Sequence, residues 1–160
     1  MDSLTAMDHP PVHPHTHFFG VLASTQQGCD FLDESQCFLE FCGCLRDENR
    51  PSLHRRAALW TIGSIGRSET GLKYILKNDS EIVNYICDLA CTASCLALRG
   101  TCFFILGLLS STEQGREVLE ENGWESPDDM NCLVSVPKVR RRGEEGRGGG
   151  GKGEERRRRE

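Results

Sequence analysis

The sequence contains no signal peptide and no run of 18 or more apolar residues, so nothing in it predicts secretion or a membrane-spanning helix. It has nine cysteines, and this odd number without a secretory signal indicates free thiols in a reducing compartment rather than a disulfide framework. No stretch alternates apolar and polar residues as an amphipathic strand does. At 160 residues, the chain is expected to form at most one soluble, cytoplasmic, all-α domain.

Charge is unevenly distributed along the chain. The formal net charge is −5, but residues 138–160 contain ten Lys/Arg and only five Glu, so the preceding part is strongly acidic. An acidic folded part argues against nucleic acid as its partner. A nucleic-acid binder driven by the basic tail stays one alternative, which deletion of residues 138–160 would test.

The sequence lacks the motifs of common catalytic sites. The segment Gly63-Ser64-Ile65-Gly66 has too few glycines for a phosphate loop and follows a helix rather than a strand. Cys29 and His54 are a conceivable nucleophile and base, but no third group is placed to orient them. We therefore expect no catalytic residue and no cofactor.

Two groups of residues are candidate metal ligands. Zinc sites usually place cysteine pairs two to four residues apart on a turn. Cys87, Cys91 and Cys95 instead have spacing that suggests one helical face, and Cys42-Gly43-Cys44 offers only a tight second pair. Four histidines, at positions 9, 13, 15 and 17, lie in a Pro/His-rich segment. We interpret the cysteines as small core residues and predict no metal site, with a small Cys/His metal-binding or redox protein as the alternative.

A glycine pair recurs three times at a nearly fixed interval. The pairs are Gly20 and Gly28, Gly63 and Gly71, and Gly107 and Gly115. Their surroundings agree as well: VLASTQQGCDFLDES at 21–35 returns as LLSSTEQGREVLEEN at 108–122, with a looser copy, SIGRSETGLKYILKN, at 64–78. A period of about 40–47 residues is typical of armadillo or HEAT repeats, so we predict a fragment of an α-solenoid.

The second repeat shows the expected helices most clearly. Apolar residues recur at helical spacing over 53–66, 69–78 and 81–90, and the third repeat restarts at Leu98. Residues with N-cap chemistry precede the later helices: Thr25, Ser68, Ser80 and Thr112. A glycine inside a helix costs about 1 kcal/mol relative to alanine. We therefore expect Gly20, Gly63 and Gly107 to mark close helix crossings that leave no room for a Cβ.

These patterns divide the chain into three zones. Residues 1–16 form a Pro/His-rich segment that we expect to be disordered. Residues 17–125 carry the helical repeats, at about 17–50, 51–96 and 97–125. Residues 126–160 end in a low-complexity, basic Gly/Arg/Glu tail that cannot offset its ordering entropy, so we expect disorder there.

Charged residues within the repeats have two interpretations. Arg55, Arg56 and Arg99 recur at matching places, which predicts salt bridges between stacked repeats or, alternatively, contacts with an acidic partner. Glu120-Glu121 is interpreted as a solvated helix end. A short stack without polar end caps should also expose apolar faces, such as Phe18-Phe19 and Phe38–Phe41.

Two segments, RRAALWTIGSIGRSETGLKYIL and LRGTCFFILGLLSSTEQGREVLEENGW, closely resemble the late helical-repeat region of the Rictor family, also called Pianissimo. That family is the rapamycin-insensitive companion subunit of TOR complex 2. The matching positions are Ala57–Trp60, Ile65-Gly66, Gly71-Leu72, Leu98–Cys102 and Trp124. The preceding FFGVLASTQQGCDFL and the Val136-Pro137 pair extend the resemblance over about residues 17–137.

The resemblance implies a non-catalytic scaffold or regulatory subunit that binds TOR kinase and the other TOR complex 2 subunits. Such a complex acts in TOR signalling, the control of AGC kinases and actin organisation. It also implies a cytoplasmic protein whose membrane association is peripheral and made through the complex. A generic armadillo-type interaction module is a further alternative. We take nine positions as structural markers of the repeat: Gly20, Gly28, Trp60, Gly63, Gly71, Arg99, Gly107, Gly115 and Trp124.

Overall fold

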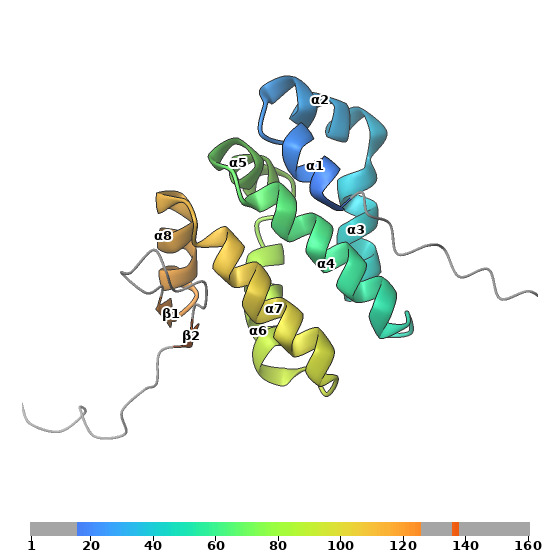
Figure 1. The fold of residues 1–160 in the computed structure, drawn as a ribbon, viewed down its shortest axis with the longest axis vertical. Helices are drawn as coiled ribbons and strands as arrows, with labels where there is room; N and C mark the ends of the chain where they lie inside the picture. Colours follow the sequence, from blue (N-terminus) through green and yellow to red (C-terminus); the bar gives the residue numbers. More distant parts are fainter. Residues whose placement is uncertain (1–15, 126–135, 138–160) are drawn as a thin grey trace, which may run out of the picture.

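The structure is a computed structural model that describes residues 16–125 and 136–137. The described residues form helices joined by short turns, followed by a small antiparallel pair of strands (Figure 1). The helices are α1 (Thr16–Leu22), α2 (Gln26–Ser35), α3 (Cys37–Arg46), α4 (Ser52–Gly66), α5 (Glu69–Asn78), α6 (Ile82–Thr92), α7 (Leu96–Leu109) and α8 (Glu113–Glu121). The strands are β1 (Trp124–Glu125) and β2 (Val136–Pro137). The prediction of an all-α helical-repeat fragment is confirmed.

Corresponding helices lie beside one another along the stack. Helix α1 packs against α4, and α4 packs against α7, so these three form one row across the molecule (Figure 1). Behind them, α3 contacts α4 and α6 contacts α7, while α5 contacts both α2 and α8. We interpret α1–α3, α4–α6 and α7–α8 as successive repeats, referred to below as the first, second and third triplets, although the third has only two helices in the described residues.

The helix α4 has the central position, and its sequence reflects that. The apolar residues that recur at helical spacing in it are all buried: Ala58, Leu59, Ile62 and Ile65. The helix contacts α1, α3, α5 and α7, which explains why its apolar residues are not confined to one stripe. Each fully buried Leu or Ile side chain contributes about 1.5–3 kcal/mol relative to an exposed one, so α4 is the main apolar link between the triplets.

The predicted caps of the short second helices are confirmed at three equivalent turns. In each, a Ser or Thr hydroxyl oxygen accepts a hydrogen bond from the backbone N–H of the second glycine of the pair. The three bonds join Gly28 to Thr25 at 3.1 Å, Gly71 to Ser68 at 3.1 Å and Gly115 to Thr112 at 3.0 Å. This bond satisfies one of the free N–H groups in the first helical turn.

The same three glycines allow the chain to fold back closely after the first helix of each triplet. A Cβ at any of them would overlap a backbone carbonyl oxygen six residues earlier. The overlapping pairs are Gly28 with Leu22, Gly71 with Ile65, and Gly115 with Leu109. Because a backbone carbonyl cannot rotate aside as a side chain can, the cap and the tight turn both depend on glycine here.

Of the three glycines predicted to mark helix crossings, Gly20 and Gly63 lie at such crossings. A Cβ at Gly20 of α1 would lie 2.6 Å from the carbonyl oxygen of Ser64 in α4. A Cβ at Gly63 of α4 would overlap the side chain of Ile105 in α7. Gly107 is buried in α7. The glycines therefore let one triplet's first helix approach that of the next.

Three sequence predictions about local structure are wrong. Ser80 does not cap α6: the N-cap is Glu81, without a side-chain bond, because Ser80 lies in a turn closed by the Ile82 N–H and the Asp79 carbonyl at 3.3 Å. Helix α7 begins at Leu96, two residues before the predicted restart. Phe38 is not exposed but only 1% accessible, since its ring packs edge-on against Tyr74 of α5, with ring centroids 5.4 Å apart.

The strands β1 and β2 pair antiparallel, Trp124 with Pro137 and Glu125 with Val136. Trp124 is buried, and its ring packs edge-on against Phe103 of α7 at 5.5 Å between centroids. The pairing brings two residues of the segment 126–160, where we expected disorder, into the described fold. The rest of that segment and residues 1–15 lie outside the described residues.

Candidate protein-interaction groove

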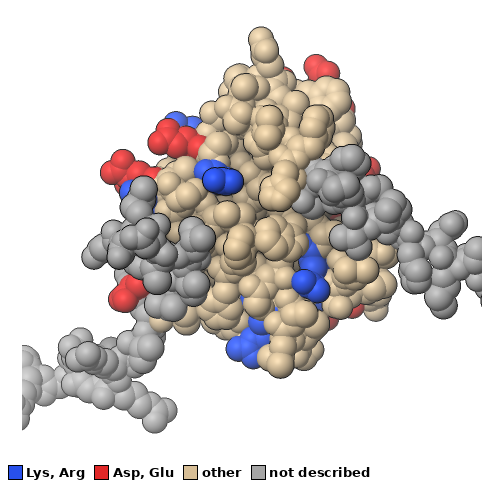
Figure 2. All heavy atoms as spheres, viewed as in Figure 1, with Lys and Arg blue, Asp and Glu red and all other residues tan. Residues whose placement is uncertain are grey.

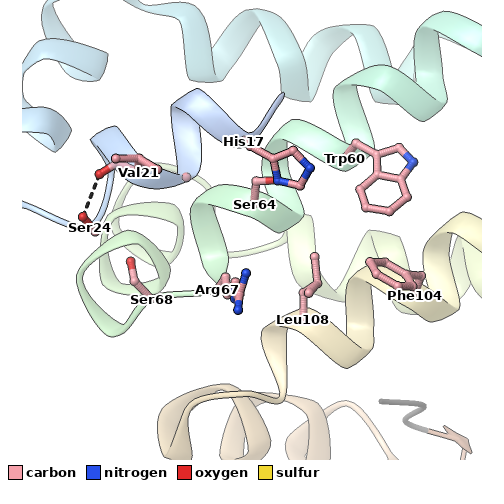
Figure 3. Close-up of a pocket in the computed structure, with 10 residues that line it drawn as sticks. His17, Val21, Ser24, Trp60, Ser64, Arg67, Ser68, Phe104 and Leu108 are labelled. Carbon is pink, nitrogen blue, oxygen red and sulfur yellow. Dashed lines mark hydrogen bonds between the residues drawn. The ribbon is translucent and has the colours of Figure 1, made fainter. Parts of the chain in front are cut away.

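Equivalent positions of the three triplets line one groove along α1, α4 and α7. The interval of 43 and 44 residues relates His17, Trp60 and Phe104, and likewise Val21, Ser64 and Leu108. The groove has a volume of about 670 Å³ (Figure 3). Its lining residues are His17, Gly20, Val21, Ser24, Trp60, Ser64, Arg67, Ser68, Phe104 and Leu108. The repeat thus forms a continuous surface from positions that are far apart in sequence.

An aromatic pair forms the apolar part of the groove. The rings of Trp60 in α4 and Phe104 in the neighbouring helix α7 pack against each other, with centroids 4.7 Å apart and planes inclined by 44° (Figure 3). Phe104 is 40% exposed and Val21, on the α1 side, is 72% exposed. Exposed aromatic groups of this kind are typical anchors of protein interfaces, because their burial removes a large apolar area from water.

Arg67 supplies the positive charge of the groove. It follows the last residue of α4 and its side chain is exposed, and among the described residues no Asp or Glu contributes to the groove lining. In Figure 2, the surface over α1, α4 and α7 is mostly uncharged with scattered basic groups, and acidic groups lie at its margins. Although the sequence is acidic overall, this face is therefore not.

Hydroxyl groups near the groove contact carbonyls across the junctions of the triplets. The Ser68 hydroxyl donates to the carbonyl of Ala23 at 3.4 Å, and the Ser111 hydroxyl contacts that of Arg67 at 3.1 Å, besides a shorter bond of 2.6 Å to Leu108 within its own triplet. Each contact across a junction links a turn of one triplet to the end of the first helix of the triplet before it. These contacts satisfy carbonyl groups at helix C-termini and hold the groove walls in register.

The predicted salt bridges of three arginines are wrong for the described residues. Arg55 donates through Nε to the carbonyl of Leu45 at 2.9 Å, and Arg99 donates through Nε to the carbonyl of Ala90 at 3.3 Å. Arg56 donates to the Thr101 hydroxyl at 3.1 Å. Arg55 and Arg99 bind carbonyls near the C-terminal ends of α3 and α6, where a positive charge is favourable, so their role is to dock the third helix of each triplet.

Two ion pairs join the first and second triplets: Lys77 of α5 lies 3.7 Å from Asp33 of α2, and the shorter pair is that of Arg46 and Asp79. Arg46 of α3 binds Asp79 at the end of α5 through two nitrogen–oxygen contacts of 2.5 and 2.9 Å. The hydrogen bond from Arg46 holds the pKa of Asp79 below its usual value. The Arg46 guanidinium also lies 5.7 Å from the ring centre of Tyr85 in α6. This contact therefore connects three helices.

Half of the eight described cysteines are buried core residues. Burial raises the pKa of Cys42, Cys87 and Cys102 to about 12, so these thiols stay protonated at neutral pH and are poor metal ligands. Cys91 lies near the end of α6, and Cys95 lies beyond it as the N-cap of α7. The expected single helical face of Cys87, Cys91 and Cys95 is therefore wrong. Within residues 16–125, no three His, Cys, Asp or Glu side chains gather as metal ligands do.

The conceivable nucleophile and base are not arranged for catalysis. The Cys29 thiol is buried, donates to the carbonyl of Ala23 at 3.5 Å and has a pKa raised by that burial. His54 lines a separate hollow between α3 and α4, and Cys29 is absent from that lining. His17 lies in α1 at the groove; the other three histidines lie outside the described residues. Glu120 and Glu121 end α8 and are exposed, as predicted.

The sequence analysis marked only part of the groove. Of the nine repeat positions, Gly20 and Trp60 line the groove. Arg99 instead binds the C-terminal end of α6. Three others belong to the helix caps: Gly28, Gly71 and Gly115. Arg67, Phe104 and Val21 were not singled out. The repeat interval of 43–44 residues could have identified Phe104 and Val21, because it makes Phe104 equivalent to Trp60 and Val21 equivalent to Ser64.

Comparison with known proteins gives a consistent result. A family model described as "Rapamycin-insensitive companion of mTOR, domain 5" matches residues 53–125. Protein pianissimo A of Dictyostelium discoideum is 37% identical over 122 residues, which is 76% of this chain and 10% of the relative. The human "Rapamycin-insensitive companion of mTOR" is 31% identical over 156 residues, 83% of this chain and 9% of the relative.

A yeast relative extends this similarity. The "Target of rapamycin complex 2 subunit TSC11" of Saccharomyces cerevisiae is 32% identical over 131 residues, covering 75% of this chain and 9% of the relative. The chain thus spans about a tenth of the length of the curated relatives it matches. None of the helices in the described residues is long and apolar enough to cross a membrane.

Proposed function

Because this chain belongs to the Rictor/Pianissimo family, we propose that it acts as a non-catalytic scaffold or regulatory segment of the TOR complex 2 kinase assembly. Its partners are TOR kinase and other TOR complex 2 subunits, bound by protein–protein contacts and without nucleic acid. It acts in the cytoplasm, in TOR signalling, the control of AGC kinases and actin organisation, and reaches membranes only peripherally through the complex.

The observation that supports this proposal best is the groove formed by stacked first helices. Glycines at the crossings bring α1, α4 and α7 together, and the resulting surface presents aromatic and aliphatic side chains with one arginine. The thiols of Cys42, Cys87 and Cys102 are protonated core groups, which favours a binding surface over a chemical centre. Helical repeats commonly bind partners along such extended surfaces.

The proposal is tested by coprecipitation from cells that express the tagged full-length chain. We expect TOR kinase and other TOR complex 2 subunits to be recovered with the unchanged chain. Gly63→Leu should abolish recovery, because its side chain would occupy the space of Ile105. Gly43→Ala is the matched control, since a Cβ there meets nothing within 4 Å. Recovery of other proteins but of no TOR complex 2 subunit would favour a generic armadillo-type module instead.

The metal-binding or redox alternative is tested on the same protein purified without a histidine tag. Elemental analysis is expected to find no stoichiometric zinc. Zinc bound at one equivalent per chain, and lost when Cys87, Cys91 and Cys95 are replaced together, would overturn the scaffold proposal in favour of this alternative.

A further inference from the structure

The groove along α1, α4 and α7 presents apolar side chains from helices of all three triplets. The Trp60 and Phe104 rings lie together at one end of the groove (Figure 3), Val21 adds an exposed aliphatic side chain from α1, and Leu108 adds one from α7. A segment lying in the groove would bury parts of all four side chains at once. Aromatic side chains that become buried on binding carry a disproportionate share of the binding energy.

Arg67 differs from the arginines that stabilise the fold. Arg46 and Arg50 pair with Asp79 and Asp47 at 2.5 and 3.4 Å. Among the described residues, Arg67 has no carboxylate within salt-bridge distance and, unlike Arg55, Arg56 and Arg99, no side-chain hydrogen bond, although it lines the groove. An exposed guanidinium beside an apolar surface binds carboxylates in a defined, often bidentate geometry.

The backbone of the groove walls is already hydrogen-bonded within the chain. The Ser24 hydroxyl donates to the Val21 carbonyl at 2.6 Å, and the Ser68 hydroxyl donates to the Ala23 carbonyl at 3.4 Å. A ligand that depended on these carbonyls would have to break internal bonds. Side-chain contacts with the rings and with Arg67 are therefore the main means of recognition.

We propose that this groove binds a segment of a partner protein that combines apolar side chains with an aspartate or glutamate. The apolar side chains lie on the Trp60–Phe104 pair, and the carboxylate pairs with Arg67. The inference rests on the proposed scaffold function, because it assumes a protein partner. It goes further by assigning one surface and by requiring an acidic residue in that partner.

The test uses the full-length chain and random peptides of about twelve residues displayed on phage. We expect selection to enrich peptides with aromatic or branched apolar residues and at least one Asp or Glu. Calorimetry on a synthetic selected peptide should show a loss of about tenfold or more for Arg67→Glu, because repulsion replaces attraction at the contact. Changing the acidic residue of the peptide to Lys should restore binding to Arg67→Glu. Phe104→Ser should weaken binding of both peptides by a similar factor.

Lys73→Glu is the matched control, since Lys73 is exposed on α5 and absent from the groove lining; it should leave affinity unchanged. Enrichment of basic peptides, no enrichment at all, or equal binding by Arg67→Glu and the unchanged chain would overturn the inference. Binding to phosphatidylserine vesicles that depends on Arg67, without peptide binding, would overturn it in favour of a membrane surface. The coprecipitation described above is independent, so TOR complex 2 association without peptide binding would reject the groove and retain the scaffold.

Discussion

The first and second triplets have corresponding helices but bury different surfaces. Four apolar residues of the first triplet are more than half exposed, and the residues 43 or 44 positions later are buried. The pairs are Phe18 (57%) and Thr61 (4%), Val21 (72%) and Ser64 (7%), Phe31 (55%) and Tyr74 (6%), and Leu39 (53%) and Val83 (1%). The difference comes from neighbours: the second triplet is covered by the first, whose outer face has the chemistry of an interface. In a helical repeat, burial therefore belongs to the junction between repeats rather than to the repeat itself.

The largest expected effect directly tests this comparison at one pair of equivalent residues. Tyr74→Ala should lower the free energy of unfolding by about 3–5 kcal/mol, as is usual for a buried aromatic side chain. Phe31→Ala should lower it by less than about 1 kcal/mol, because that ring is already 55% exposed. Urea unfolding of the full-length chain, followed by circular dichroism, measures both. Equal losses would mean that the two triplets do not differ in the way that their exposed surfaces indicate.

A second, smaller effect separates glycines that the stack requires from glycines that it tolerates. Gly71→Ala should destabilise the chain by about 1–3 kcal/mol, because its Cβ would overlap the Ile65 carbonyl at the turn after α4. Gly100→Ala is the matched control in α7, where a Cβ meets nothing within 4 Å. There alanine should stabilise the helix by up to about 1 kcal/mol. Urea midpoints that shift in the same direction for both variants would contradict the assigned role of Gly71.

The sequence predicted what depends on local chemistry and on the repeat. The caps at Thr25, Ser68 and Thr112 were predicted because a hydroxyl residue stands three positions before a glycine. The close helix crossing at Gly63 was predicted because glycine destabilises the interior of a helix and must therefore have a packing role there. The predictions that were wrong concern residues whose partners are distant in sequence. Arg55 has a carbonyl rather than a carboxylate as its partner, because the third helix of the triplet ends beside it.

The groove shows the same limit. Sequence spacing places Trp60, Phe104 and Val21 on equivalent positions, but it does not say which face of the helix row stays open to solvent. Phe38, in contrast, was predicted to be exposed and is buried, because Tyr74 of the next triplet covers it. Apolar character alone therefore does not separate an internal junction from an external surface; the packing of the neighbouring triplet decides it.

The smallest effect concerns the Arg46–Asp79 ion pair at the junction of the first and second triplets. The positions 44 residues after Arg46 and Asp79 are Ala90 and Gly123, so the next junction cannot form an equivalent pair. The pKa of Asp79 is lower in the folded protein than in an unfolded chain, where it is about 3.9. The ion pair therefore stabilises the fold fully at pH values above about 3.9. This stabilisation is lost as the pH falls through the pKa of Asp79 in the folded protein. Asp79→Asn should therefore cost about 1 kcal/mol at neutral pH, a modest amount because Arg46 is 38% exposed. The difference between the two proteins in urea unfolding should shrink steadily below about pH 4. A difference that stays constant with pH would show that Asp79 acts through its hydrogen bonds as a neutral group rather than as a charged partner of Arg46.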